Sequence, residues 1–254
     1  MLLSIVIPTY QSGQYIGAAL QSVRAQTFKD YEIIIIDGGS IDDTLSVVNK
    51  FDNLPIRFYQ EPDKGVYDAM NKGISLAIGD WVYFMGSDDS LYDDRVLESI
   101  ALVGATEKAD VLYGDVVLAS SGKRYAGEFS LHRLLFSENI CHQAVFYKRS
   151  IFNRIGHYNL DYKIWADWDF NIRCFKHTEF VINYLDIVVA LYNDQSGVSS
   201  KEDVVLVTEL PLFYLYQIEF LKQQNAQLLS SKSFVIGSKL IGVFNKIGVG
   251  KFFK

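Results

Sequence analysis

The chain has 254 residues, 49% of them hydrophobic, which is enough for one large α/β domain with a sizeable core. Its formal net charge of −6 argues against a general nucleic-acid-binding surface, so we expect no nucleic-acid partner. The two cysteines, Cys141 and Cys174, show neither metal-ligand nor disulfide-framework spacing, which favours a reducing compartment. The N-terminus lacks the pattern of a secretory signal and no apolar run reaches the length of a membrane span, so we expect a cytoplasmic protein.

The first part of the chain alternates buried strands with a helix. Residues 2–7 form a continuous apolar run that is closed by Pro8, and residues 15–25 have helical periodicity. A second apolar run at 31–36 contains four consecutive isoleucines and ends at Asp37–Ser40, which includes two glycines. Glycines after a buried strand let the backbone approach a ligand closely, and strand ends commonly present binding groups.

The same alternation continues through the next fifty residues. The predicted elements are a helix at 44–51 capped by Asp42 or Asp43, a strand at 56–60, a helix at 67–77 and a strand that begins at Trp81. This spacing predicts right-handed βαβ units and a mostly parallel central sheet flanked by helices. Ligands collect at the carboxyl ends of such strands, so we expect the residues that follow four different strands to converge on one crevice: Thr9, Asp37, Asp63 and Asp88.

The apolar strand that begins at Trp81 ends in two adjacent carboxylates, Asp88 and Asp89. An ionised carboxylate is costly to bury without a partner, so this pair favours a divalent cation as its counter-charge. Hard oxygen ligands suit Mg2+ or Mn2+ carrying a diphosphate. The alternative is that both residues only cap a helix predicted at 91–101.

The second half of the chain is less regular. The predicted elements are a helix ending near 108, a strand at 111–119, a turn at 120–123, helices at 129–138, 150–155 and 169–175, and strands at 144–147, 180–183 and 187–192. Asp167 and Asp169 lie beside Trp165 and Trp168 near the start of the last helix. They are either ordinary N-terminal stabilisers of that helix or, because aromatic neighbours desolvate a carboxylate, candidates for a base.

The C-terminal part of the chain has a different composition. The polar loop at 193–197 is either a mobile lid or a surface connection. No acidic residue follows Glu219, whereas Lys232, Lys239 and Lys246 recur every seven residues, which places them on one face of a helix. We therefore predict a helical, lysine-rich extension at 201–254 that either rests on an anionic membrane surface or is a solvated or domain-packing tail.

Four sequence blocks, in this order, resemble family 2 glycosyltransferases: Ser4–Tyr10, Ile36–Thr44, Glu61–Ile74, and Gly79-Asp80 followed by Gly86–Asp89, which is similar to the family's Asp-x-Asp region. The resemblance covers roughly residues 2–200. It implies a nucleotide-diphospho-sugar transferase (GT-A) fold, a divalent metal ion (Mn2+ or Mg2+) and inversion at the sugar's anomeric carbon. The corresponding domain is residues 1–200, with a nucleotide-binding half at 1–119 and an acceptor half at 120–200.

The resemblance also implies roles for single residues. On the nucleotide side, Thr9 and Asp37 match nucleoside-binding positions, and Lys64 and Gly65 match the loop near base and ribose. Asp88 would face the ribose or the metal, and Asp89 would face the metal and the diphosphate. On the acceptor side, Asp167 matches the general base. Two positions depart from the family pattern. Gly86 stands where an aspartate is frequent, which leaves open which carboxylates reach the metal, and Ala166 stands where an acidic residue usually precedes the base. Asp167 remains the preferred base over Asp169. His142 falls on the acceptor side, where it either shapes that pocket or has a structural role.

The sequence therefore predicts a metal-dependent inverting glycosyltransferase that moves a sugar from a nucleoside-diphosphate sugar to a saccharide or lipid-linked acceptor. The resemblance favours UDP- or dTDP-sugars, with a guanine nucleotide as the alternative. Cell-surface polysaccharide or glycolipid assembly follows by analogy, with the tail on the inner face of the cell membrane. The rivals are an inactive sugar-nucleotide-binding module and a sugar nucleotidyltransferase; the latter typically has a basic glycine-rich loop after its first strand, whereas residues 9–14 contain only Gly13 and no basic residue.

Overall fold

The structure is a computed structural model that describes residues 2–195, 205–206, 219, 221–231 and 236. The chain divides into two units, Met1–Leu206 and Val207–Lys254. In the second unit, residues 221–230 are helical. The lysine face at 232, 239 and 246 lies outside the described residues, so the membrane contact of the tail stays a prediction. No helix in the described parts of the chain is long and apolar enough to cross a membrane.

The first unit alternates strands and helices in its N-terminal half. The elements there are β1 (Leu3–Thr9), α1 (Ile16–Ala25), β2 (Tyr31–Asp37), α2 (Thr44–Val48), the 3-10 turn η1 (Asn49–Phe51), β3 (Ile56–Gln60), α3 (Val66–Leu76) and β4 (Trp81–Phe84). The elements that follow are β5 (Ser90–Leu91), α4 (Val96–Thr106), β6 (Val111–Leu118), β7 (Arg124–Tyr125), α5 (Leu131–Phe136), the 3-10 turn η2 (His142–Ala144), β8 (Val145–Lys148), α6 (Ser150–Ile155), α7 (Ala166–Lys176) and β9 (Ile182–Tyr192).

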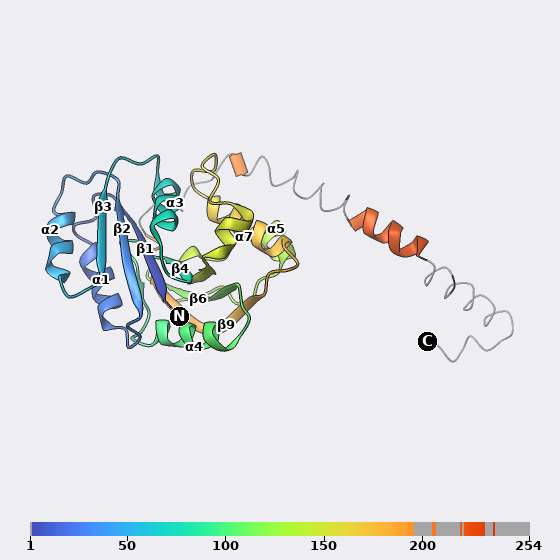
Figure 1. The fold of residues 1–254 in the computed structure, drawn as a ribbon, viewed down its shortest axis with the longest axis horizontal. Coiled ribbons are helices and arrows are strands. Elements are labelled where there is room, and N and C mark those ends of the chain that lie inside the picture. Colours follow the sequence, from blue (N-terminus) through green and yellow to red (C-terminus); the bar gives the residue numbers. More distant parts are fainter. Residues whose placement is uncertain (1, 196–204, 207–218, 220, 232–235, 237–254) are drawn as a thin grey trace. The chain divides into compact units, whose positions relative to one another are not determined.

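One sheet runs through this unit in the order β3-β2-β1-β4-β8-β6-β9-β5, with β7 paired to β6 (Figure 1). Strands β3, β2, β1 and β4 are mutually parallel, as are β6 and β9. Strand β8 is antiparallel to both β4 and β6, and β5 and β7 are antiparallel to their partners. This arrangement confirms the predicted α/β class. The sheet is mixed, and its parallel part brings the carboxyl ends of β1, β2, β3 and β4 to one edge.

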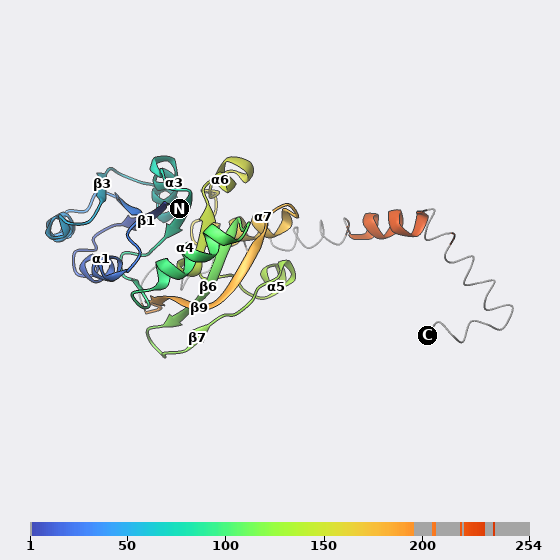
Figure 2. The ribbon, with the colours of Figure 1, turned by 60° about the horizontal axis from the view of Figure 1, so that its bottom comes forward.

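Helices cover both faces of the sheet, which explains why its central strands read as unbroken apolar runs. Alternate residues of β1, Leu3, Ile5 and Ile7, belong to the core cluster formed with α1 and α4. The intervening Val6 faces α3, where it lies close to Gly73. Figure 2 shows α1 and α3 on opposite sides of β1.

Aromatic rings fix α7 against the sheet. Phe170 of α7 stacks on Phe152 of α6 at 4.9 Å between ring centroids and meets Tyr147 of β8 edge-on at 5.2 Å. Phe84 of β4 packs against Phe152 at 6.2 Å. Such ring pairs contribute about 0.5–1.5 kcal/mol each beyond the area they bury. The first turn of α7, which carries Asp167 and Asp169, is therefore held at a defined place above the sheet.

Two sequence predictions about secondary structure are wrong. The helix expected at 91–101 begins only at Val96, with Arg95 at its N-cap, so Asp88 and Asp89 do not cap it. Ser90–Leu91 instead pairs with β9, because an unpaired sheet edge offers backbone hydrogen bonds that local helical periodicity does not reveal. The two strands expected at 180–183 and 187–192 are one strand, β9, whose register against β6 shifts around Asp115.

We expect Gly73→Ala to destabilise the protein by about 1–2 kcal/mol, despite the better helix propensity of alanine. A Cβ at Gly73 would stand 2.3 Å from Cγ1 of Val6, a branched side chain with little rotamer freedom in a strand. Gly17→Ala in α1 is the matched control, since its Cβ would meet only Val47 Cγ1 at 3.4 Å. Urea unfolding measures both; equal stability of Gly73→Ala and the wild type would contradict the close approach of α3 to β1.

Candidate functional site

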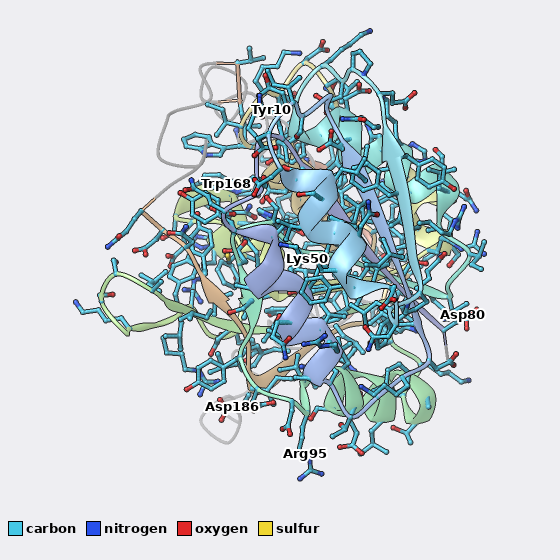
Figure 3. The ribbon with its side chains drawn as sticks, turned by 90° about the vertical axis from the view of Figure 1, so that its left-hand side faces the viewer. Tyr10, Lys50, Asp80, Arg95, Trp168 and Asp186 are labelled. Atoms are coloured by element: carbon cyan, nitrogen blue, oxygen red, sulfur yellow. The ribbon has the colours of Figure 1, made fainter. Side chains whose placement is uncertain are left out.

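A cavity of about 610 Å³ is bordered by the start of α3, the loop after β4, the segment before β8, the start of α7 and the end of β9. The polar and charged residues on its wall include Tyr67, Asp88, Asp89, Asn139, His142, Gln143, Asp167 and Asn193. In Figure 3, Tyr10, which follows β1, and Trp168 of α7 lie in the upper half of the view, whereas Asp80, which precedes β4, and Arg95 lie in the lower half. The cavity therefore belongs to the end of the sheet where β1 and β4 finish.

Asp89 is buried in the wall of this cavity, with 3% of its surface exposed. Its Oδ1 accepts a hydrogen bond from the backbone N–H of Asn193 at 2.8 Å, and its Oδ2 accepts one from Nε2 of Gln143 at 2.8 Å. Burial raises the pKa of Asp89 to about 6, and the negative charge of Asp88 adds to the rise. The Asp88 carboxylate accepts from Nδ2 of Asn193 at 3.2 Å.

These two carboxylates fit a divalent cation that keeps few protein ligands. Among the described residues, no group of three or more His, Cys, Asp or Glu side chains is placed to hold a metal ion. Mg2+ and Mn2+ in nucleotide sites commonly take one or two carboxylates, with phosphate oxygens and water completing the coordination. The raised pKa of Asp89 indicates a buried charge that a cation would stabilise. The assignment of Asp88 and Asp89 as metal ligands nevertheless stays a prediction.

Asp167 lies in the first turn of α7 with 6% of its surface exposed. Tyr67 of α3 donates to Oδ1 at 2.6 Å, and Asn139 donates through Nδ2 to Oδ2 at 2.8 Å. Burial raises the pKa of Asp167, while the nearby His142 and the Tyr67 hydrogen bond oppose that rise. A carboxylate whose pKa is raised towards neutral accepts a proton more readily than an ordinary aspartate, as a general base must.

Asp169, the alternative base, is engaged elsewhere. Its Oδ2 accepts from Nε of Arg173 at 2.8 Å, one turn further along α7, and it does not border the cavity. Arg173 also donates to the backbone oxygens of Ile155 and His157. Asp169 therefore joins α7 to the end of α6, and the geometry favours Asp167 as the base.

His142 borders the cavity on η2. Burial lowers its pKa, although the carboxylates of Asp167 and Asp88 oppose that shift. A lowered pKa keeps the imidazole neutral at pH 7, so His142 can offer or accept a hydrogen bond there without adding charge. His142 therefore lies on the cavity wall, and its part in shaping the acceptor pocket stays a prediction.

Asp37 and Thr9 end neighbouring parallel strands but do not border the cavity. The Asp37 side chain is fully buried; its Oδ1 accepts from the backbone N–H groups of Gly39 and Ser40, and its Oδ2 accepts from the Ser40 hydroxyl at 2.6 Å. Thr9 donates its hydroxyl to the backbone oxygen of Ile7 at 3.2 Å. In this structure Asp37 shapes the loop after β2, and the nucleoside-binding roles of both residues stay predictions.

Lys64 and Gly65 form the entry to α3. Gly65 has φ of +118°, a conformation that favours glycine, and its N–H donates to Oδ1 of Asp63 at 2.9 Å. The backbone N–H of Lys64 donates to the Asp68 carboxylate at 3.0 Å. Neither residue borders the cavity, but Val66, which follows them, does.

The loops at this end of the sheet touch one another in pairs. A Cβ on Gly38, after β2, would lie 2.6 Å from Oδ2 of Asp63, after β3. The hydroxyls of Ser12, after β1, and Ser87, after β4, share a hydrogen bond of 2.8 Å. The strand ends are thus linked in two pairs. Of the four residues expected to converge on one crevice, only Asp88 borders the cavity, where it is joined by Asp89, Asp167 and His142.

Sequence reasoning missed several residues on the cavity wall. Tyr67, Asn139, Gln143 and Asn193 contact the acidic residues, and Tyr125, Trp165, Trp168 and Tyr192 supply aromatic surface. Neutral amides and tyrosines follow no periodic rule, so their contacts depend on which segments meet in space. The one available signal was that Tyr67 lies within a sequence block that resembles a known family.

Comparison with known proteins supports the resemblance to family 2 glycosyltransferases that the sequence blocks indicate. Residues 4–171 match the family described as Glycosyl transferase family 2. A PGL/p-HBAD biosynthesis glycosyltransferase of Mycobacterium tuberculosis is 48% identical over 216 residues, which cover 83% of this chain and 84% of that protein. An uncharacterized glycosyltransferase of the same species is 32% identical over 176 residues, which cover 67% of each chain.

Solved structures show the same fold at low sequence identity. S. aureus TarS in complex with UDP-GlcNAc has a TM-score of 0.67 and 22% identity, over 80% of this chain and 62% of that chain. The mannosyltransferase PcManGT from Pyrobaculum calidifontis, in complex with GDP-Man and Mn2+, has a TM-score of 0.59 and 18% identity, over 75% of this chain and 56% of that chain. The expected GT-A fold is thereby confirmed. Because the family match spans residues 4–171, more than half of the chain, this chain belongs to glycosyl transferase family 2.

Proposed function

We propose that the protein is a metal-dependent, inverting transferase that moves a sugar from a UDP- or dTDP-sugar to the hydroxyl of a saccharide or lipid-linked acceptor. The observation that carries this proposal is the single cavity in which the acidic pair Asp88 and Asp89 and the buried carboxylate of Asp167 meet. The acidic pair is suited to the diphosphate, and Asp167 is suited to the acceptor hydroxyl.

The reaction that fits this arrangement is a single displacement. The acceptor oxygen attacks the anomeric carbon as the bond from that carbon to the diphosphate oxygen breaks, and the acceptor proton passes to Asp167. The attack comes from the face opposite the leaving group, which inverts the configuration. A divalent cation held by Asp89, with Asp88, would supply the neutralising charge for the leaving nucleoside diphosphate.

The structural neighbours support a nucleotide-sugar donor. TarS is solved with UDP-GlcNAc, whereas PcManGT is solved with GDP-Man and Mn2+, so the fold itself accommodates either base. The loops after β1, β2 and β3 would form the nucleoside site, with Thr9, Asp37, Lys64 and Gly65 at the positions that the family resemblance assigns to it. We retain uracil or thymine as the preferred base.

The acceptor side of the cavity is rich in aromatic surface. Trp165 and Trp168 lie with ring centroids 5.3 Å apart, and Tyr125 and Tyr192 also border the cavity. Aromatic rings suit the apolar faces of sugar rings and the apolar part of a lipid-linked acceptor. The M. tuberculosis relative is named for PGL/p-HBAD biosynthesis, which supports a role in the biosynthesis of a glycosylated product for this chain. A cytoplasmic location, with the tail at the membrane, belongs to the same proposal.

A thermal-shift screen of sugar nucleotides with and without Mn2+ tests the proposal. We expect UDP- or dTDP-sugars to raise the melting temperature in the presence of Mn2+, because a ligand at 100 times its Kd stabilises the folded state by about 2.7 kcal/mol. EDTA should remove most of this stabilisation. Stabilisation that is equal with Mn2+ and with EDTA would contradict the metal requirement, and slow release of nucleoside diphosphate would separate an enzyme from an inactive binding module.

A further inference from the structure

The carboxylate of Asp167 is held from two sides by elements that are distant in the sequence. Tyr67 of α3 donates to Oδ1 at 2.6 Å, and Asn139, which follows α5, donates to Oδ2 at 2.8 Å. Both partners border the cavity. Two hydrogen bonds from opposite sides fix the orientation of the carboxylate, one on each oxygen.

The Asn139 amide is in turn held by a buried hydrogen-bond chain. Asn171 donates from Nδ2 to Oδ1 of Asn139 at 2.9 Å, and Tyr147 of β8 donates to Oδ1 of Asn171 at 2.7 Å. Asn171 is 1% exposed and Tyr147 is 0% exposed, and neither borders the cavity. The chain therefore runs from a core strand, through α7, to the cavity wall.

The direction of this chain is determined by its end at Asp167. An ionised carboxylate only accepts, so Asn139 must present its NH2 group to Asp167 and its oxygen to Asn171. Asn171 must then present its NH2 group to Asn139 and its oxygen to Tyr147, which donates. In this one arrangement the amides of Asn139 and Asn171 and the Tyr147 hydroxyl all have complementary partners, so rotating either amide would leave like groups facing each other.

Tyr67 has a second acceptor within reach, the backbone oxygen of Ile164. Its hydroxyl carries one hydrogen, which points to Asp167 when that side chain is ionised. After Asp167 takes up a proton on Oδ1, the new O–H can donate to the Tyr67 oxygen while the Tyr67 hydrogen turns to Ile164. Both protonation states of Asp167 thus have a hydrogen-bond partner, as a group that gains and loses a proton in each cycle requires.

We propose that Tyr67 and Asn139 are positioning residues that hold the Asp167 carboxylate in the orientation and ionisation state needed to accept the acceptor's proton. This inference rests on the proposed role of Asp167 as general base. Nothing in the family match assigns a role to either residue.

Several titratable groups face Asp167, and their charges near pH 7 bear on how the Asp167 titration is read. They are Tyr67 from α3, Cys141 and His142 from the segment before β8, Tyr147 from β8 and Tyr158 after α6. Burial keeps the tyrosine and cysteine pKa values raised and the His142 pKa lowered, so these groups are uncharged near pH 7. Tyr67 favours the ionised form of Asp167, so loss of its hydroxyl should shift the Asp167 titration to higher pH.

The test is an NMR titration of the full chain labelled at the aspartate carboxyl carbons, with the Asp167 signal identified by its absence from Asp167→Asn. We expect Tyr67→Phe and Asn139→Ala each to move the Asp167 midpoint to higher pH by about one unit, because each removes a charge-assisted hydrogen bond. Tyr31→Phe is the matched control. Tyr31 is 6% exposed, as is Tyr67, and its hydroxyl donates only to the Val23 backbone oxygen, so its removal should leave the midpoint unchanged.

An unchanged Asp167 midpoint in a folded Tyr67→Phe protein would overturn the proposal, and that variant stays informative if Asn139→Ala fails to fold. The proposed function fails in a different way. A shifted midpoint combined with full sugar transfer by Asp167→Asn would overturn the base role and leave the positioning of Asp167 by Tyr67 supported.

Discussion

Asp167→Asn is expected to lower sugar transfer by about 10²–10⁴-fold while the affinity for the donor stays near that of the wild type. The asparagine side chain has almost the same shape but cannot take up the proton of the attacking hydroxyl. Steady-state kinetics with calorimetry of donor binding measures the two effects separately. Because burial raises the Asp167 pKa, kcat/KM of the wild type should fall as the pH is lowered. The midpoint of that fall should lie above 3.8, the ordinary pKa of an aspartate.

Asp169→Asn is the matched control for that experiment. It lies two residues further along the same helix, is similarly buried, and contacts Arg173 rather than the cavity. We expect it to lower stability, since it leaves Arg173 without its carboxylate partner, and to retain transfer. The reverse pattern, with full turnover by Asp167→Asn and none by Asp169→Asn, would assign the base to Asp169.

Asp89→Asn is expected to remove the effect of Mn2+ on donor affinity, a loss of at least about tenfold or 1.4 kcal/mol. The carboxylate supplies the charge that holds a cation against the diphosphate, and a neutral amide does not. Calorimetry of the preferred donor with and without Mn2+ gives the measurement. The same titration of Asp88→Asn shows which carboxylate dominates, the point left open by Gly86. Unchanged, Mn2+-dependent affinity in Asp89→Asn would exclude Asp89 as a ligand.

The stability of the same variant shows whether a loss of binding comes from unfolding. In metal-free protein the pKa of Asp89 rises from 3.8 in the unfolded chain to about 6 in the folded state. The folded state therefore binds this proton more tightly, and the stability that protonation contributes is lost as pH rises through that window. In EDTA the stability of the wild type should therefore fall as pH rises from about 4 to about 6, and Asp89→Asn should lack this part of the pH dependence. A variant that shows no cooperative unfolding transition would show that the binding loss reflects misfolding.

The N-terminal half of the fold could be predicted from the sequence because its signals are local. Apolar runs such as residues 31–36 are buried on both faces and alternate with amphipathic helices, which is typical of parallel strands. The ordered blocks around Asp37, Gly65 and Asp88 resembled a family that the comparison confirmed. The elements beyond residue 85 were less accurate, because β5 and β9 depend on pairing between segments about a hundred residues apart.

The sequence by itself determined the fold class, the family and the presence of acidic residues where strands and helices end. Only the tertiary structure decided which of those residues share a cavity. It placed Asp167 beside Tyr67 and Asn139, turned Asp169 to Arg173, and enclosed Asp37 in its own loop. The physical reason is that a carboxylate's role depends on burial and on the donors around it, and these come from segments whose meeting no local pattern records.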